Sequence, residues 1–152
     1  EMICSTSPGL DLPIPSNGLL KAAVKCPLCF PVENLRIRLS LLHDRSIDLA
    51  ITVSHLDVAS VALKAAGGRC LVSDYINVPL SDDGTGGTLF QACGPSPNVT
   101  SPITSPPNFR PENSFQIFKG VSSCGSWILF IEDIFPEIGG TFQEAHVEVE
   151  YY

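Results

Sequence analysis

The stretch LRIRLSL, at residues 35–41, alternates apolar and polar side chains without interruption. Successive side chains of a β-strand point to opposite faces, so this period of two predicts a strand with one buried face. The same alternation returns at residues 49–53 (LAITV) and at residues 145–151 (AHVEVEY). None of these stretches keeps a helical period of 3.6 residues over three turns. We therefore expect a chain built from strands.

The stretch WILFI, at residues 127–131, is apolar on both faces. This pattern is typical of a central strand, or of a strand whose outer face is covered by another surface. Residues 58–66 have some helical character, but Val61 and Leu63 alternate with smaller residues and two glycines follow, so we predict a strand there too. Clusters of proline and glycine separate these stretches. Many short strands with such turns predict an all-β fold, a jelly-roll-like antiparallel β-sandwich.

Length and net charge limit the number of domains and the kinds of partner that the chain can have. The 152 residues suit a single domain over residues 1–152, with residues 1–11 as an N-terminal extension. The sequence begins without a basic and then apolar leader, so we expect that a leader was removed or that a longer chain was cut. A net charge of −7 disfavours nucleic-acid binding, because an acidic surface repels phosphate. The apolar runs are too short for membrane insertion.

An even number of cysteines, spread along a chain of low charge, predicts disulfides formed in an oxidising compartment. The protein is therefore expected to be secreted or extracellular. A zinc site is the competing interpretation, but only Cys26 and Cys29 have the spacing of a ligand pair. The sequon at Asn98 predicts a glycosylation site on a loop of Pro and Ser. The six residues expected to form disulfides are Cys4, Cys26, Cys29, Cys70, Cys93 and Cys124.

The sequence does not determine how these cysteines pair. Cys70 and Cys93 lie on either side of residues 76–87, so a bond between them would close that excursion. The other two expected pairs are Cys26 with Cys29, and Cys4 with Cys124. We expect these three pairings.

Several spaced motifs align, in the same order, with one known family. The chain resembles the P/Homo B domain, a jelly roll that follows the catalytic domain in kexin- and furin-like proteases, from about residue 12 to residue 152. The matching segments are residues 12–18 (LPIPSNG, resembling IPDNG), 43–49 (HDRSIDL, resembling HTYxGDL), 82–87 (DDGTGG, resembling the acidic Gly-rich loop), 109–120 (FRPENSFQIFKG, resembling FRPEGxLxxFNG) and 125–133 (GSWILFIED, resembling GTWTLxVxD).

The sequence differs from the family motifs at several positions. Ser16 stands where the family has aspartate, and Ile47 stands where it has glycine. Cysteines are not a general feature of the family, so it implies no pairing. What the resemblance implies is a jelly-roll fold and an accessory role beside a subtilisin-like catalytic domain, although no such domain precedes the motifs within these residues.

Four aspartates are candidates for a structural Ca²⁺ site. Asp48 opens one predicted strand, Asp133 closes another, and Asp82 and Asp83 lie in a glycine-rich loop. If these strand ends meet at one edge, carboxylates and loop carbonyls would form the oxygen site that Ca²⁺ prefers. The alternative is that Asp82 and Asp83 belong to a solvated turn and that Asp48 forms an Asx turn.

We expect no catalysis. The three histidines, His43, His55 and His146, do not neighbour a nucleophile motif, and Gly-x-Ser-x-Gly is absent from the sequence. Residues 85–87 (TGG) lack the lysine and the helix of a phosphate-binding loop.

The main functional hypothesis is a non-catalytic extracellular subunit of a surface, matrix or filamentous assembly. Low charge, the apolar strand at residues 127–131 and an N-terminal segment able to pair with a neighbour favour self-association, or binding to another extracellular protein. The alternative is an accessory domain that stabilises or regulates a subtilisin- or kexin-like serine protease. A third hypothesis is an adhesive or carbohydrate-binding module, which would use exposed aromatics such as Tyr75, Tyr151 and Tyr152.

Overall fold

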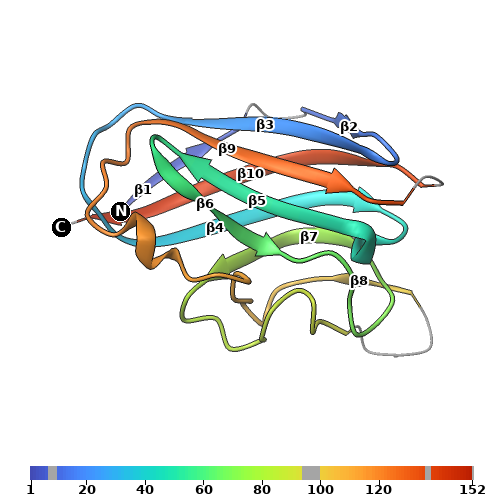
Figure 1. Ribbon diagram of the computed structural model, residues 1–152. Coiled ribbons are helices and arrows are strands. Elements are labelled where there is room, and N and C mark those ends of the chain that lie inside the picture. The colour runs from blue at the N-terminus through green and yellow to red at the C-terminus, as the bar shows by residue number, and fades with distance from the viewer. Residues whose placement is uncertain (7–9, 94–99, 136–137, 152) are drawn as a thin grey trace.

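Two β-sheets packed face to face form the protein, which confirms the predicted all-β sandwich (Figure 1). The computed structural model describes residues 1–6, 10–93, 100–135 and 138–151. Within these ranges the only helical elements are two short 3-10 helices, η1 (Ser46–Asp48) and η2 (Phe115–Phe118). Among the same residues, no helix has the length and apolar character needed to cross a bilayer.

The first sheet, sheet A, has six strands in the described residues, and β7–β8 is its parallel pair. Its order is β1-β10-β4-β7-β8, and β2 also pairs with β10. Its strands are β1 (Met2–Ser5), β2 (Leu12–Ile14), β4 (Val32–His43), β7 (Val72–Ser81), β8 (Ser101–Ile103) and β10 (Gly140–Tyr151).

The second sheet, sheet B, has four antiparallel strands in the described residues, in the order β3-β9-β5-β6. Its strands are β3 (Gly18–Cys26), β5 (Leu49–His55), β6 (Val58–Lys64) and β9 (Gly125–Asp133). The strand predicted at residues 58–66 is thus confirmed as β6. The stretch at residues 127–131 forms β9, which lies between β3 and β5 as a central strand should.

The buried core residues of the strands alternate with exposed or half-buried ones, as the period of two predicts. In β4 the odd-numbered side chains between residues 35 and 41 are buried, and β5 and β10 bury alternate residues in the same way. Removing these aliphatic side chains from water is the main favourable term in folding. Trp127 of β9 is fully buried at one end of this core.

The N-terminal residues belong to the fold, so the expected extension over residues 1–11 is wrong for its first part. β1 pairs antiparallel with β10, with Met2 opposite Val149 and Ser5 opposite His146. Cys4 faces the core from this edge strand. β10 can accept β1 because β1 and β2 pair with different halves of the long strand.

Three disulfides join the six cysteines: Cys4–Cys26, Cys29–Cys124 and Cys70–Cys93. The last pairing is confirmed, and the expected Cys26–Cys29 and Cys4–Cys124 bonds are wrong. Cys26 is the inward-facing last residue of β3, the edge of sheet B, and Cys4 faces it from β1, the edge of sheet A. Their bond therefore joins the two sheets along one side of the sandwich, while Cys29 lies beyond the strand end and bonds to Cys124.

Candidate functional site

His43 and Asp133 form a buried pair at one end of the sandwich. The ring nitrogen Nε2 of His43 lies 2.7 Å from Oδ2 of Asp133, and both side chains are fully buried. The other nitrogen, Nδ1, accepts a hydrogen bond from the backbone N–H of Arg45 at 2.9 Å. Oδ1 of Asp133 accepts from the N–H of Phe135. Both nitrogens of His43 are thus engaged within the protein, so the ring has no free nitrogen to serve as a base.

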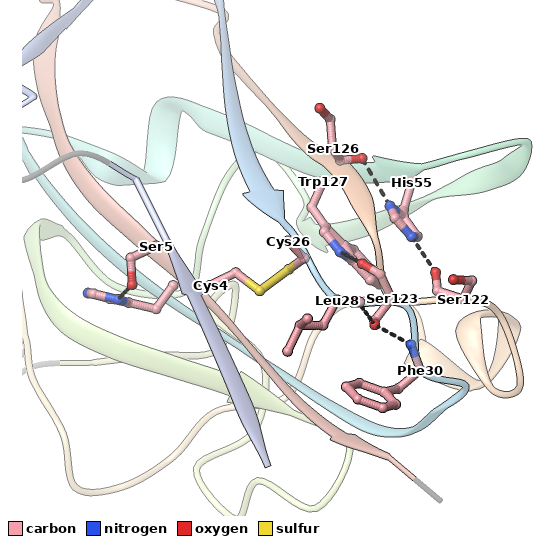
Figure 2. The surroundings of a disulfide bond; sticks show 11 residues. Cys4, Ser5, Cys26, Leu28, Phe30, His55, Ser122, Ser123, Ser126 and Trp127 are labelled. Atoms are coloured by element: carbon pink, nitrogen blue, oxygen red, sulfur yellow. Dashed lines mark hydrogen bonds between the residues drawn. A yellow bond between two sulfur atoms is a disulfide. The ribbon is translucent and has the colours of Figure 1, made fainter.

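His55 lies at the opposite end of β5, in a cluster with Trp127 and the loop that carries Cys124. Its ring stacks on the indole of Trp127, with centroids 3.7 Å apart and planes 1° from parallel. Its nitrogens lie 2.9 Å from the carbonyl oxygen of Ser126 and 2.7 Å from that of Ser122 (Figure 2). Both nitrogens of His55 therefore face backbone carbonyl oxygens and not a hydroxyl or thiol that could act as a nucleophile.

Ser123 holds this cluster to the loop between β3 and β4. Its hydroxyl donates to the carbonyl of Leu28 at 2.6 Å and accepts from the N–H of Phe30 at 2.9 Å, as Figure 2 shows. The indole N–H of Trp127 donates to the carbonyl of Ser123 at 3.0 Å. These hydrogen bonds satisfy the buried polar groups around the tryptophan, and the adjacent Cys29–Cys124 disulfide links the same two loops covalently.

One surface arrangement has the composition of a catalytic triad. The hydroxyl of Ser5 lies 2.6 Å from Nδ1 of His146, and Nε2 of His146 lies 3.6 Å from the carboxylate of Glu144. The N–H that follows the serine is normally an oxyanion donor in such sites. Here the N–H of Thr6 donates to the carbonyl of Ala145, so that donor is already used. That N–H is therefore not free to stabilise a tetrahedral intermediate.

The four aspartates proposed for Ca²⁺ lie in two separate groups. Asp48 and Asp133 are near the same end of sheet B, because Leu49 pairs with Asp133 between β5 and β9. The carboxylate of Asp82 instead accepts from the N–H of Phe115 and the hydroxyl of Ser114, and that of Asp83 accepts from the hydroxyl of Ser81. Over the described ranges, no group of three or more His, Cys, Asp or Glu side chains gathers where it could hold a metal.

The positive charge beside Asp48 comes from the chain itself. Nε of Arg45 lies 3.6 Å from Oδ2 of Asp48. Lys64 is buried near it, and burial lowers the pKa of the ammonium to about 8, although the charges of Asp48 and Glu112 oppose this shift. The expected four-carboxylate site therefore does not fit the structure.

The outer faces of sheets A and B differ in the side chains that they expose. The outer face of sheet A has a cleft of about 160 Å³. Its lining is predominantly acidic, with Arg36 and Lys119 as its basic members; the carboxylates are Glu1, Glu33, Asp82, Asp83, Glu148 and Glu150.

The outer face of sheet B carries apolar side chains beside charged ones, among them Lys25 and Glu132. Phe130 and Ile128 of β9 are half-buried on it, and Leu19 of β3 is 48% exposed beside them. The ammonium of Lys21 lies 5.6 Å from the centre of the Phe130 ring. We call this surface, defined by Leu19, Lys21, Ile128 and Phe130 with the small side chains around them, the β9 face. Exposed apolar groups gathered on one face are typical of interaction surfaces.

The remaining predicted site residues are the glycosylation site Asn98 and the three tyrosines. Asn98 and Tyr152 lie outside the described residues. Tyr75 is fully buried, so it is not available to bind a sugar. The Tyr151 ring stacks on that of Phe30, with centroids 4.2 Å apart.

Sequence reasoning missed the roles of His43 and Lys64. His43 follows the strand predicted at residues 35–41 by two residues, and Asp133 closes another predicted strand, which is the one signal that could have suggested their contact. Nothing in the sequence marks Lys64 as buried.

Comparison with known proteins identifies the fold. No protein-family model and no characterised protein sequence matches the chain. A crystal structure of the Aeromonas sobria serine protease in complex with a chaperone matches with a TM-score of 0.58 and 15% identity, over 97% of this chain and 26% of the matched chain. A crystal structure of the same serine protease matches with a TM-score of 0.56 and 13% identity, over 99% of this chain and 26% of that one.

At these identities the similarity shows a shared β-rich fold. The chain spans about a quarter of the length of the chains it matches.

Proposed function

We propose that this chain is a non-catalytic accessory domain of the P/Homo B type, which docks on a serine protease unit and stabilises it in an extracellular setting. The observation that carries the proposal is the match of nearly the whole chain to about a quarter of a serine protease structure. The order of the sequence motifs supports the same assignment. Three disulfides support an oxidising compartment.

The state of the histidines supports the non-catalytic part of the proposal. Both ring nitrogens of His43 and of His55 have partners within the protein, and the N–H of Thr6, which follows Ser5, already donates to the carbonyl of Ala145. An accessory domain needs no nucleophile, because it contributes surface and stability to the unit that it contacts.

The test is to isolate the native protein with an antibody against this chain and to treat it with a fluorophosphonate probe, which labels active serine hydrolases. We expect a labelled serine hydrolase, either on the same polypeptide or in a stoichiometric complex with it. Adding excess recombinant chain to the separated protease should lengthen its half-life at elevated temperature, because a ligand of the folded state stabilises that state.

The recombinant chain and its Ser5→Ala variant are the matched controls. Neither should be labelled. If the recombinant chain reacts with the probe and Ser5→Ala does not, the non-catalytic assignment is wrong. If native material has no serine hydrolase with it, the accessory assignment is wrong.

A second candidate, self-assembly, is favoured by the contrast between the two outer faces. The β9 face combines apolar side chains with Lys21, Lys25 lies on the same edge strand, and Glu132 is the exposed carboxylate of β9, whereas the opposite face carries the acidic cleft. Complementary faces on opposite sides of one body give a head-to-tail contact between copies, and such contacts form open filaments when the rotation does not close.

Under this candidate, Phe130→Glu abolishes association, because it places a charge in the centre of the β9 face. Sedimentation velocity over a range of concentrations measures the effect. Leu71→Glu is the matched control, since Leu71 is 44% exposed and lies outside the strands of both faces. A wild-type chain that stays monomeric at all concentrations excludes self-assembly and leaves the β9 face to a different protein.

A further inference from the structure

Lys64 points into the sandwich because of a β-bulge. Val61 pairs with Val53 and Ala62 with Thr52, but Lys64 pairs with Ile51, so the register shifts by one residue between β5 and β6. With regular pairing, Leu63 would face inward and Lys64 outward. The extra residue turns the Lys64 side chain from the outer to the inner face of the sheet. As a result the side chains of Leu63 and Lys64 are both buried, and Lys64 is 1% exposed.

Four backbone carbonyl oxygens surround the buried ammonium group. Nζ of Lys64 donates to the carbonyl oxygens of Ala65 at 2.8 Å and Gly67 at 2.9 Å, which follow it in the chain. It also donates to that of Leu49, the first residue of β5, at 3.0 Å and to that of Ile47, in η1, at 3.3 Å. An ammonium has three N–H groups and no acceptor, so all of its hydrogen-bonding capacity is used here.

Asp48 supplies a counter-charge to this group, between the two carbonyls of Ile47 and Leu49. Asp48 is 2% exposed, and its charge acts on Lys64. Its Oδ1 atom is buried and has no hydrogen-bond partner among the described residues. Asp48 thus acts on the ammonium through its charge, while the atoms that contact Nζ are the four carbonyl oxygens. Backbone carbonyl oxygens gathered around a single point are also ligands that proteins use for hard metal cations.

We propose that the Lys64 ammonium is a built-in structural cation, which fills a cage of carbonyl oxygens where a bound metal ion would otherwise be needed. The cage joins residues 47–49 to residues 65–67 and so fixes the loop after β6 against the start of β5. This assignment replaces the Ca²⁺ expected near Asp48 and Asp133 with a cation that the chain carries itself. It does not depend on the accessory role proposed above.

Chemical rescue tests the proposal. Lys64→Ala removes the ammonium and leaves a cavity that n-propylammonium matches in length and charge. We expect the variant to melt well below wild type in sodium chloride. We also expect n-propylammonium chloride at the same ionic strength to raise its Tm by about 3 °C or more, because the added cation binds the folded state only.

Leu63→Ala is the matched control. Leu63 is fully buried next to Lys64, so this variant has a cavity of similar position but keeps the ammonium. Its Tm and that of wild type should not rise with n-propylammonium. Equal shifts in all three proteins, or no shift in Lys64→Ala, would overturn the proposal, as would a Lys64→Met variant as stable as wild type.

A measurement on the wild-type protein covers the case in which Lys64→Ala fails to fold. NMR of the 15N-labelled lysine ammonium groups should show one of the four lysines in slow exchange with water, and that signal should be missing from Lys64→Arg. Equally fast exchange of all four ammonium groups contradicts the proposal.

Discussion

Trp127→Ala should lower the free energy of unfolding by about 3–5 kcal/mol, which is the range for removing a large buried aromatic side chain. The side chain is fully buried and contacts two rings, His55 at 3.7 Å and Phe118 at 5.1 Å between centroids. The substitution also leaves the carbonyl of Ser123 without the indole N–H. Denaturant unfolding followed by far-UV circular dichroism measures the loss, since the chain has a single tryptophan and the variant has none.

Two further substitutions separate the contribution of the indole N–H from that of the ring, and a buried ring from a half-buried one. Trp127→Phe keeps an aromatic ring but removes the N–H donor, so its loss should lie between those of wild type and Trp127→Ala. Phe130→Ala changes the same strand on its outer face, where the ring is only half-buried, and should cost clearly less than Trp127→Ala. Equal losses for Trp127→Ala and Phe130→Ala would mean that the buried cluster does not anchor this end of the sandwich.

Removing the Cys29–Cys124 disulfide is the second change with a large expected effect. The two residues are 95 positions apart, and the bond joins the loop before β4 to the start of β9. In the chain-entropy account, a link of this length stabilises by up to about 4.7 kcal/mol, because it restricts the unfolded chain more than a short link does. The double variant Cys29→Ser with Cys124→Ser should therefore lose several kcal/mol in denaturant unfolding.

The Cys70–Cys93 disulfide provides the comparison. It spans only 23 positions, for which the same account gives about 3.4 kcal/mol. Cys70→Ser with Cys93→Ser should thus be less destabilising than the first double variant by about 1 kcal/mol. If the order is reversed, loop length does not govern the contribution of these bonds. Peptide mapping without reduction checks the three pairings directly.

Alternation alone was sufficient for the β-sandwich. The odd-numbered side chains of residues 35–41 are buried, and the strand predicted at residues 58–66 forms as β6. These predictions succeeded because the direction of a side chain from a strand depends on local backbone geometry. The expected Ca²⁺ site does not form, because the structure does not bring Asp82 and Asp83 to the other two aspartates. Asp48 and Asp133 meet because their strands are neighbours, whereas Asp82 follows a strand of the other sheet.

The cysteine pairing shows the same limit. Cys26 and Cys29 are adjacent in the chain, yet the end of β3 separates the sheet edge that meets Cys4 from the loop that meets Cys124. Only the order of strands across both sheets brings these partners together.

What the sequence by itself determined is the class of fold, the position of most strands and the face that each turns inward, since all of these follow from neighbours a few residues apart. The tertiary structure alone decided which cysteines bond, that residues 2–5 form an edge strand, and that Lys64 is inside. A single extra residue in β6 moves Lys64 from one face to the other, and that shift is set by pairing with β5 rather than by any residue of β6. Contacts between distant strands depend on the whole arrangement of the sheets, and a local pattern does not contain that arrangement.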